Sequence, residues 1–253
     1  MLENTKILGV KITTSSEEKI LEYINLELLK PKVKSNKVII FTPNPEQIAA
    51  AAGNSELKSL LNNATIALPD GAGVIFASKL LGKGIKARIT GVDFMRSLVK
   101  SVAGTSGGNS IRPVVAGFLG GQSGVAEQAA DCLQKMSQNL AIGYASDSFD
   151  KDKMIGSDID ILFVGLGFPK QEKWIVDHLD EVPAGIIMAV GGAFDFYSGR
   201  IPRAPFILRR IGLEWLFRLI LQPWRFFRQL RLLQFSALIL KEALSSRLKK
   251  SNE

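Results

Sequence analysis

Cysteine and histidine are almost absent from this sequence of 253 residues, which has one of each. The single thiol, Cys132, cannot form an internal disulfide. Its neighbours predict a helix, so we expect a buried structural thiol and a reducing compartment. The single histidine, His178, lies in a predicted helix with no cysteine or histidine close in sequence. These absences argue against a disulfide framework, a zinc site and a Ser–His catalytic pair.

Long hydrophobic runs are also missing. No segment reaches the roughly 18 apolar residues that a membrane-spanning helix needs. The longest apolar run near the end, Leu232 to Leu240, is bounded by Arg231 and Lys241. The first residues lack the charged lead and apolar stretch of a secretory signal. We therefore expect the chain to rest on a membrane surface, if it contacts a membrane at all.

Negative charge is scarce in the last fifth of the chain. Residues 1–198 carry 20 Lys and Arg against 21 Asp and Glu, whereas residues 199–253 carry 12 against 3. The formal net charge of +8 therefore comes from this last segment. A basic segment suits nucleic acid, an anionic membrane or a phosphorylated ligand, and charge alone does not choose among them.

What the sequence does contain is an alternation of short apolar runs and helical patterns through residues 1–198. Strands are predicted at Lys6–Ile12, Lys37–Phe41, Thr65–Leu68, Pro113–Phe118, Leu140–Tyr144, Asp160–Gly165 and Ala184–Val190. Helices are predicted at Ser16–Leu29, Pro45–Asn62, Gly71–Leu81, Val92–Val102, Ser123–Ser137 and Lys170–Leu179. This alternation indicates an α/β catalytic domain with a mainly parallel, Rossmann-like sheet flanked by helices. A Gly/Ser-rich stretch, Gly104 to Ser110, is expected to join its two halves.

Residues 199–253 mix Arg with Trp, Phe and Leu and predict a basic amphipathic appendage of two or three helices, broken near Pro205 and Pro223. If a helix continued past Pro223, most of four arginines would share one face: Arg218, Arg225, Arg228 and Arg231. This pattern favours helices that rest on anionic lipid. The alternative is a helix packed on the domain with its charged face in water.

Polar turns follow two of the predicted strands, and ligands bind beyond the carboxyl ends of strands in such sheets. Thr42 and Asn44 come directly after the strand that ends at Phe41. Asn44 also suits an N-cap, with Pro45 in the first helical position. Asp70 follows the next strand and suits either an N-cap or a general base that takes a proton from an attacking hydroxyl.

Further candidates are an arginine and several glycine-rich turns. Arg88 suits a phosphate clamp or a surface ion pair. Glycines in a turn allow a phosphate to approach the backbone at a helix N-terminus. The nucleotide-binding candidates in such turns are Gly120, Gly121, Gly167, Lys170, Gly191 and Gly192, and Gln171 lies beside them. We expect these turns to meet at one edge of the sheet.

The sequence also contains Asp158-Ile159-Asp160, which has the D-x-D form that metal-dependent glycosyltransferases use. It lies at the amino end of a predicted strand, away from the expected ligand site. We therefore assign no metal site to it.

Several of these segments together resemble the WecG/TagA/CpsF family of glycosyltransferases, from about residue 5 to about residue 230. They are TPNPE (42–46), LPDGAGV (68–74), ARITGVDF (87–94), VGLGFPKQEKW (164–174), VGGAFDFYSG (190–199), RAP (203–205), and GLEWLFRL with QPWRFFR (212–228). The PKQEKW and GLEW segments are specific, whereas TPN and PDG alone are not. Ala87 stands where many members of the family have Glu.

The resemblance implies an inverting, metal-independent enzyme with no cofactor. Such an enzyme transfers N-acetylmannosamine, or a related sugar, from a UDP donor to undecaprenyl-diphosphate-linked N-acetylglucosamine in teichoic-acid or other cell-surface polysaccharide synthesis. It implies peripheral association with the inner face of the cell membrane. The implied roles are general base for Asp70, substrate binding for Thr42, Asn44, Arg88 and Gln171, and lipid-diphosphate contacts for Arg218, Arg225 and Arg228.

Two other functions stay open on the residues alone. The glycine turn that begins at Gly117 leaves open an NAD-dependent oxidoreductase, although its spacing is not G-x-G-x-x-G. Aromatic residues beside arginines leave open a nucleic-acid binder. The resemblance favours the transferase and no nucleic-acid partner. An apolar face such as that of Gly71–Leu81 suits either core or a homo-oligomer interface.

Overall fold

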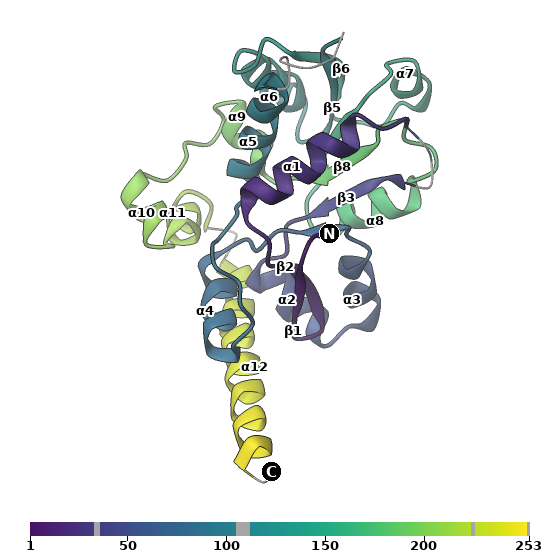
Figure 1. Ribbon diagram of the computed structural model, residues 1–253. Coiled ribbons are helices and arrows are strands. Elements are labelled where there is room, and N and C mark those ends of the chain that lie inside the picture. Colours follow the sequence, from purple (N-terminus) through teal and green to yellow (C-terminus); the bar gives the residue numbers. More distant parts are fainter. Residues whose placement is uncertain (33–35, 105–111, 224–225, 252–253) are drawn as a thin grey trace.

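A six-stranded parallel sheet forms the centre of the molecule (Figure 1). The computed structural model describes residues 1–32, 36–104, 112–223 and 226–251. The strands are β3 (Val38–Phe41), β4 (Ile66–Ala67), β5 (Val114–Gly120), β6 (Leu140–Ser146), β7 (Ile161–Gly165) and β8 (Ile186–Ala189). Their order is β4-β3-β8-β7-β5-β6, and every neighbouring pair is parallel. The predicted α/β class with a mainly parallel sheet is confirmed.

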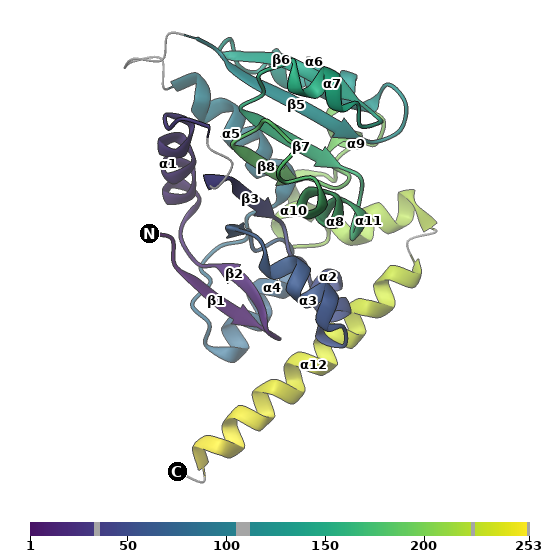
Figure 2. The same cartoon turned by 90° about the vertical axis from the view of Figure 1, so that its right-hand side faces the viewer.

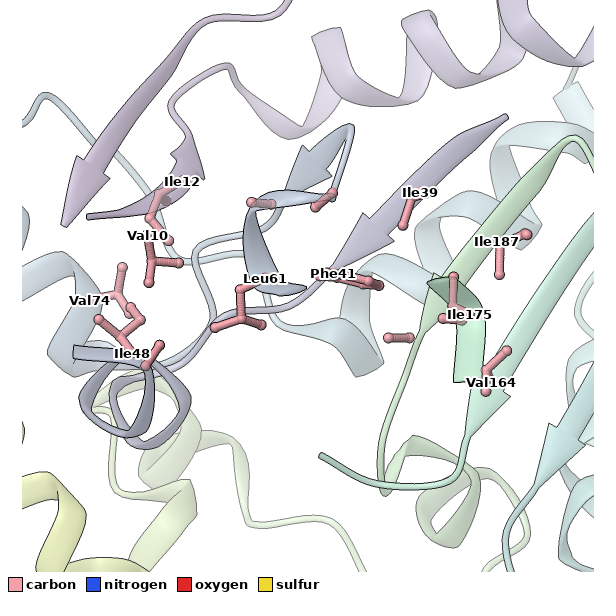
Figure 3. Packing of buried hydrophobic residues seen from close by; sticks show 14 of the residues in the cluster. Val10, Ile12, Ile39, Phe41, Ile48, Leu61, Val74, Val164, Ile175 and Ile187 are labelled. Carbon is pink, nitrogen blue, oxygen red and sulfur yellow. The ribbon is translucent and has the colours of Figure 1, made fainter. Parts of the chain in front are cut away.

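Both faces of the sheet are buried, as the continuous apolar runs require. Side chains alternate along each strand, so that Ile39 and Phe41 of β3 enter one core and Val38 and Ile40 enter the other. Figure 3 shows the first core, where Phe41 lies among side chains from neighbouring strands and helices.

Helices pack on both faces of the sheet. The second core is closed by α1 (Glu17–Leu28), α5 (Gly91–Gly104) and α6 (Val125–Gln134). The first core is closed by α2 (Pro45–Ala52), α3 (Ser55–Asn62), α4 (Ala72–Leu81) and α8 (Lys170–Asp177). All six strands of the sheet run in the same direction, which leaves the carboxyl ends of the strands along one edge.

The structure corrects two predicted elements. The single strand predicted at Lys6–Ile12 is an antiparallel hairpin outside the main sheet, formed by β1 (Asn4–Ile7) and β2 (Val10–Thr13). Leu8 and Gly9 have positive φ angles of 50° and 82°, which a two-residue hairpin turn requires. The helix predicted at Pro45–Asn62 is divided, because Gly53 ends α2 and the Asn54 side chain caps α3.

Two short helices were not expected from the sequence: α7 (Lys151–Ile155) and α9 (Ala193–Tyr197). Both are only five residues long, too short for a periodic apolar pattern to show. Of the Gly/Ser-rich connector, only Gly104 at the end of α5 is described. The rest of that segment lies outside the described residues.

The C-terminal segment forms α10 (Phe206–Arg210), α11 (Glu214–Leu221) and α12 (Phe226–Ser251). Because α11 ends before Pro223, Arg218 and Arg231 lie on different helices. The condition for a shared arginine face, a helix that continues past Pro223, is therefore not met. None of the described helices is both long and apolar enough to cross a membrane. The division of the chain at residue 198 stays a prediction.

Helix α12 lies across α2 and α4 and then continues away from the body (Figures 1 and 2). Its buried side chains, Phe235, Ile239 and Ala243, recur every four residues and so form one face. A helix of 26 residues is about 39 Å long, so its far end extends beyond the residues that hold it.

We expect Phe235→Ala to weaken the docking of α12 by about 3 kcal/mol, because it removes an aromatic ring that is 3% exposed. Amide hydrogen exchange in residues 232–243 should become about 100-fold faster. Leu240→Ala on the same helix is the control, since Leu240 is 53% exposed and should change exchange little. Equal effects of the two substitutions would contradict the packing.

Candidate active site

A cavity of about 500 Å³ opens at the carboxyl ends of four adjacent strands, β4, β3, β8 and β7. Helix α11 and the beginning of α12 lie beside this edge of the sheet (Figure 2). The body contributes Thr42, Asn44, Gln47, Asp70, Arg88, Thr90, Gly167, Phe168, Gln171, Gly191 and Gly192 to the lining. The C-terminal helices and the turn before them contribute Gly212, Glu214, Trp215, Arg218, Leu232, Phe235 and Ser236. The site is therefore built jointly by the sheet and the appendage.

Asp70 does not cap the helix that follows it. The N-cap of α4 is Gly71, whose φ of +93° places the chain in a conformation that favours glycine. The Asp70 carboxylate instead accepts a hydrogen bond of 3.3 Å from the backbone amide of Gly91, the first residue of α5. The side chain is thereby turned toward the cavity and the N-terminus of a different helix.

Burial raises the pKa of Asp70 from its ordinary value to about 6. The Gly91 amide and the positive charge of Arg88 lower it, but less than burial raises it. The negative charges of Glu214 and Asp93 raise it further. A carboxylate with this pKa is ionised near neutral pH and is more basic than an ordinary aspartate, as a general base should be.

Thr42 and Asn44 both line the cavity, but Asn44 also has a structural role. Its side chain accepts from the Gln47 amide at 3.0 Å, and the Gln47 side chain accepts from the Asn44 amide at 3.3 Å, which forms a capping box at the start of α2. Thr42 is buried, and a Cβ on Gly91 would lie 3.1 Å from its methyl group. Glycine at position 91 therefore lets α5 begin close to β3.

Gln171 holds two glycine turns at the wall of the cavity. Its side-chain oxygen accepts from the backbone amides of Gly167 at 3.2 Å and Gly191 at 2.9 Å. Its amide nitrogen donates to Glu172 at 2.9 Å, and both side chains are almost fully buried. Burial raises the pKa of Glu172. The Gly167 and Gly191 amides are thus already bonded within the protein, which leaves neither free to bind a phosphate as expected.

The two arginines of the cavity both connect the body to the appendage. Arg88 donates to the backbone carbonyl of Arg209 at the end of α10, at 2.9 Å. The guanidinium of Arg218 lies 4.6 Å from the ring centre of Phe196. A Cβ on Gly192 would lie 2.8 Å from an Arg218 nitrogen, so a larger residue at position 192 would require the guanidinium to shift.

An ion-pair network fixes the appendage to α5. Arg203 donates from both terminal nitrogens to Asp93, at 2.6 and 2.7 Å, and from Nε to Glu214 at 3.3 Å. Burial alone would raise the pKa of Asp93, but the hydrogen bonds from Arg203 and Thr90 outweigh it and lower the pKa. Glu214 is thereby held at the wall of the cavity, at the first position of α11.

Not every predicted site residue lies at the cavity. Gly120, Gly121 and Lys170 are absent from its lining. Glycine is required at position 120 for a structural reason, because its φ is +109° and a Cβ there would lie 2.8 Å from the carbonyl carbon of Gly165. Arg225 lies outside the described residues, as does the side chain of Arg228 in the first turn of α12.

The residues that the sequence analysis assigned to no functional site have structural surroundings of their own. Asp160 receives two hydrogen bonds from Arg112, at 2.8 and 2.9 Å, and pairs with Lys32 at 3.0 Å; Asp158 pairs with Lys32 at 2.6 Å. His178 stacks on Trp174 with 4.7 Å between ring centres. Cys132 is partly exposed, not buried as expected, because it lies near the outer side of α6.

Sequence reasoning from the residues missed Glu214, Trp215 and Arg203. Glu214 and Arg203 belong to a segment that was interpreted mainly from its basic and apolar composition. A single Glu in such a segment gives little indication of a functional role. The resemblance did include these residues, in GLEW and RAP, but assigned them no role.

A parallel sheet whose carboxyl edge holds a basic carboxylate, cavity-lining arginines and glycine turns defines an α/β group-transfer enzyme of the Rossmann-like class. Residues 5–249 match the glycosyl transferase WecG/TagA/CpsF family. The chain belongs to this family and is a glycosyltransferase.

Three bacterial relatives have the same printed name, N-acetylglucosaminyldiphosphoundecaprenol N-acetyl-beta-D-mannosaminyltransferase. The protein of Bacillus subtilis (strain 168) is 29% identical over 247 residues, 95% of this chain and 93% of the relative. That of Bacillus spizizenii is 32% identical over 213 residues, 82% and 80% of the two chains. That of Staphylococcus aureus (strain MW2) is 30% identical over 225 residues, 87% and 85%.

Replacing Gln171 by Leu should lower the free energy of unfolding by about 3 kcal/mol, because it leaves the Gly167 and Gly191 amides without their acceptor. Urea denaturation measures the change. Lys173→Ala, on the exposed side of the same helix, is the control and should stay within about 0.5 kcal/mol of wild type. A Gln171→Leu protein as stable as the control would show that the two turns do not depend on this side chain.

Proposed function

We propose that this glycosyltransferase moves N-acetylmannosamine, or a closely related sugar, from a UDP donor to N-acetylglucosamine linked to undecaprenyl diphosphate, with inversion and without a metal or other cofactor. The names of the relatives support the sugar and the acceptor. The observation that carries the mechanism is the Asp70 carboxylate, whose pKa of about 6 suits a base and which faces a cavity lined by Arg88 and Arg218. The pathway proposed is teichoic-acid or other cell-surface polysaccharide synthesis.

In this mechanism Asp70 takes the proton from the attacking hydroxyl of the acceptor sugar. The hydroxyl oxygen forms a bond to the anomeric carbon of the donor, on the face opposite the leaving group. The bond from that carbon to the diphosphate oxygen breaks, and its electron pair leaves with UDP. A single displacement of this kind inverts the anomeric centre, since no protein side chain forms a bond to the sugar.

The leaving diphosphate needs positive charge as the bond breaks. Arg88 lines the cavity, and guanidinium groups bind phosphate oxygens in two-pronged hydrogen bonds. The aspartates of the D-x-D segment do not supply a metal site in this proposal, because Arg112 and Lys32 already occupy their oxygens. Arginine is therefore proposed to neutralise the phosphate charge that a divalent cation neutralises in metal-dependent enzymes.

The appendage is proposed to dock on the inner, cytoplasmic face of an anionic membrane, where a polyprenyl acceptor would lie. Large apolar side chains are exposed along its helices: Phe206, Ile207, Ile211, Ile220, Phe226 and Phe227, with exposed fractions between 58% and 77%. Arg209 and Arg210 lie among them on α10. Apolar side chains next to arginines favour binding to anionic lipid headgroups.

The oxidoreductase alternative loses its main support. It depended on the glycine turn after β5, and neither Gly120 nor Gly121 lines the cavity. The tight contact of Gly120 with Gly165 explains that turn without a nucleotide.

We expect Asp70→Asn to lower the transfer rate at least about 100-fold, because an amide cannot take the proton. In the wild type, kcat/KM should fall about tenfold for each pH unit below pH 6, since the carboxylate of Asp70 must be ionised to act. The assay combines a panel of UDP-sugars with a short-chain polyprenyl-diphosphate acceptor.

The control for that assay is Asp131→Asn, an exposed aspartate on α6. Asp70→Asn should melt no lower than wild type at pH 8, because the neutral amide avoids burying a charge. Full activity of Asp70→Asn would remove this residue from the mechanism. Loss of transfer on adding EDTA would contradict metal independence.

The double substitution Ile207→Ser and Ile220→Ser should reduce co-sedimentation with phosphatidylglycerol vesicles at least about tenfold. The two side chains are 72% and 70% exposed, and polar replacements remove apolar area that would enter the lipid. Ile155→Ser is the matched control, because Ile155 is 50% exposed on α7, in the body of the molecule. Equal vesicle binding by all three proteins would argue against docking through the appendage.

A further inference from the structure

Glu214 brings a second carboxylate into the cavity, and the proposed mechanism gives it no task. It is the first residue of α11, and Arg218 lies one turn later on the same helix. Residues four apart lie on one face of a helix, with Cβ atoms about 5–6 Å apart. Both side chains line the cavity, so α11 presents a carboxylate and a guanidinium side by side.

A hydrogen bond from Arg203 fixes the position of the Glu214 carboxylate. Arg203 donates to its Oε1 from Nε at 3.3 Å, and Arg203 is itself held by two hydrogen bonds to Asp93. The side chain of Glu214 is only 16% exposed. Within the described ranges, no group donates to Oε2. One oxygen is therefore anchored and the other is available to a ligand.

A sugar linked to a diphosphate matches this pair of charges. Guanidinium groups bind phosphate oxygens, and an ionised carboxylate accepts hydrogen bonds from hydroxyl groups. The sugar of such a ligand begins at the atom next to the phosphate, so a site for it must lie within a few ångströms of the phosphate site. Glu214 lies at that distance from Arg218.

We propose that Glu214 binds a hydroxyl of the acceptor N-acetylglucosamine while Arg218 binds the diphosphate that carries it. The proposal rests on the function proposed above. Held at both ends, the acceptor sugar directs its attacking hydroxyl toward Asp70, which lines the same cavity. Glu214 is thus a substrate-binding residue that selects a sugar diphosphate over a bare polyprenyl phosphate.

The electrostatics of the cavity agree with this placement. The charged groups that act on Asp70 are Arg88 next to it, Asp93 on α5 and Glu214 on α11, together with the Gly91 amide. Glu214 raises the pKa of Asp70, which places its charge near the base. Removing that charge should move the acidic limb of the kcat/KM profile to lower pH.

The test compares Glu214→Gln with wild type in the full chain, using the short-chain polyprenyl-diphosphate N-acetylglucosamine acceptor and the UDP-sugar donor. We expect the acceptor KM to rise at least tenfold and the donor KM to change less than twofold. Acceptors that each lack one sugar hydroxyl complete a double-mutant cycle. With wild type, one of these acceptors should show the same rise in KM that Glu214→Gln causes with the full acceptor. With Glu214→Gln, that acceptor should show no further rise in KM. Glu127→Gln is the control, because it makes the same change at an exposed glutamate of α6 that does not line the cavity.

The outcomes separate the two proposals. Transfer by wild type with an unchanged acceptor KM in Glu214→Gln overturns the role of Glu214 and leaves the proposed function standing. Additive effects of the substitution and of every deoxy acceptor overturn it too, as does the same KM pattern in Glu127→Gln. No transfer by wild type overturns the proposed function and this inference with it. Should Glu214→Gln fail to fold, Glu214→Asp keeps the charge near Arg203 and must show the same acceptor-specific rise.

Discussion

The hydrogen-bonded ion pair of Arg203 with Asp93 holds the C-terminal part of the cavity lining against the body. Arg203 lies just before the C-terminal helices, Asp93 lies in the first turn of α5, and the two hydrogen bonds between them fix the start of the appendage against the body. The same guanidinium holds Glu214. Loss of this network would loosen α11, and with it Glu214 and Arg218, although Arg88 and Phe196 also contact this part of the chain.

This network is of moderate strength. The Asp93 side chain is 42% exposed, so water and salt weaken its attraction to Arg203. By contrast, α12 is held by fully buried side chains such as Ile239. The physical chemistry therefore divides the appendage into a firmly docked α12 and a more weakly held α10–α11 unit.

Much of the fold could be predicted from the sequence, because both signals that define it are local. Apolar runs such as Ile161–Gly165 are long enough to mark buried parallel strands, and polar turns after them mark the ligand edge. The hairpin at Leu8 and Gly9 was missed because its apolar pattern continues through the turn. The break at Gly53 was missed because one glycine in a helical pattern is common.

The site was less predictable, because its geometry depends on contacts between distant segments. Thr42, Asp70, Arg88 and Gln171 were expected to meet, and all four line one cavity. That Gln171 is bonded to both glycine turns could not be read from its sequence position. The relation of Arg203 to Asp93 joins residues 110 positions apart, and no local pattern encodes such a distance.

The clamp formed by Gln171 has a consequence for how negative charge can be compensated in the cavity. Since the Gly167 and Gly191 amides are already bonded to Gln171, they are not available to an anionic ligand. The positively charged side chains in the described lining are Arg88 on the body and Arg218 on α11. Charge compensation in the cavity therefore requires both parts of the chain, and it is complete only while α11 lies against the body.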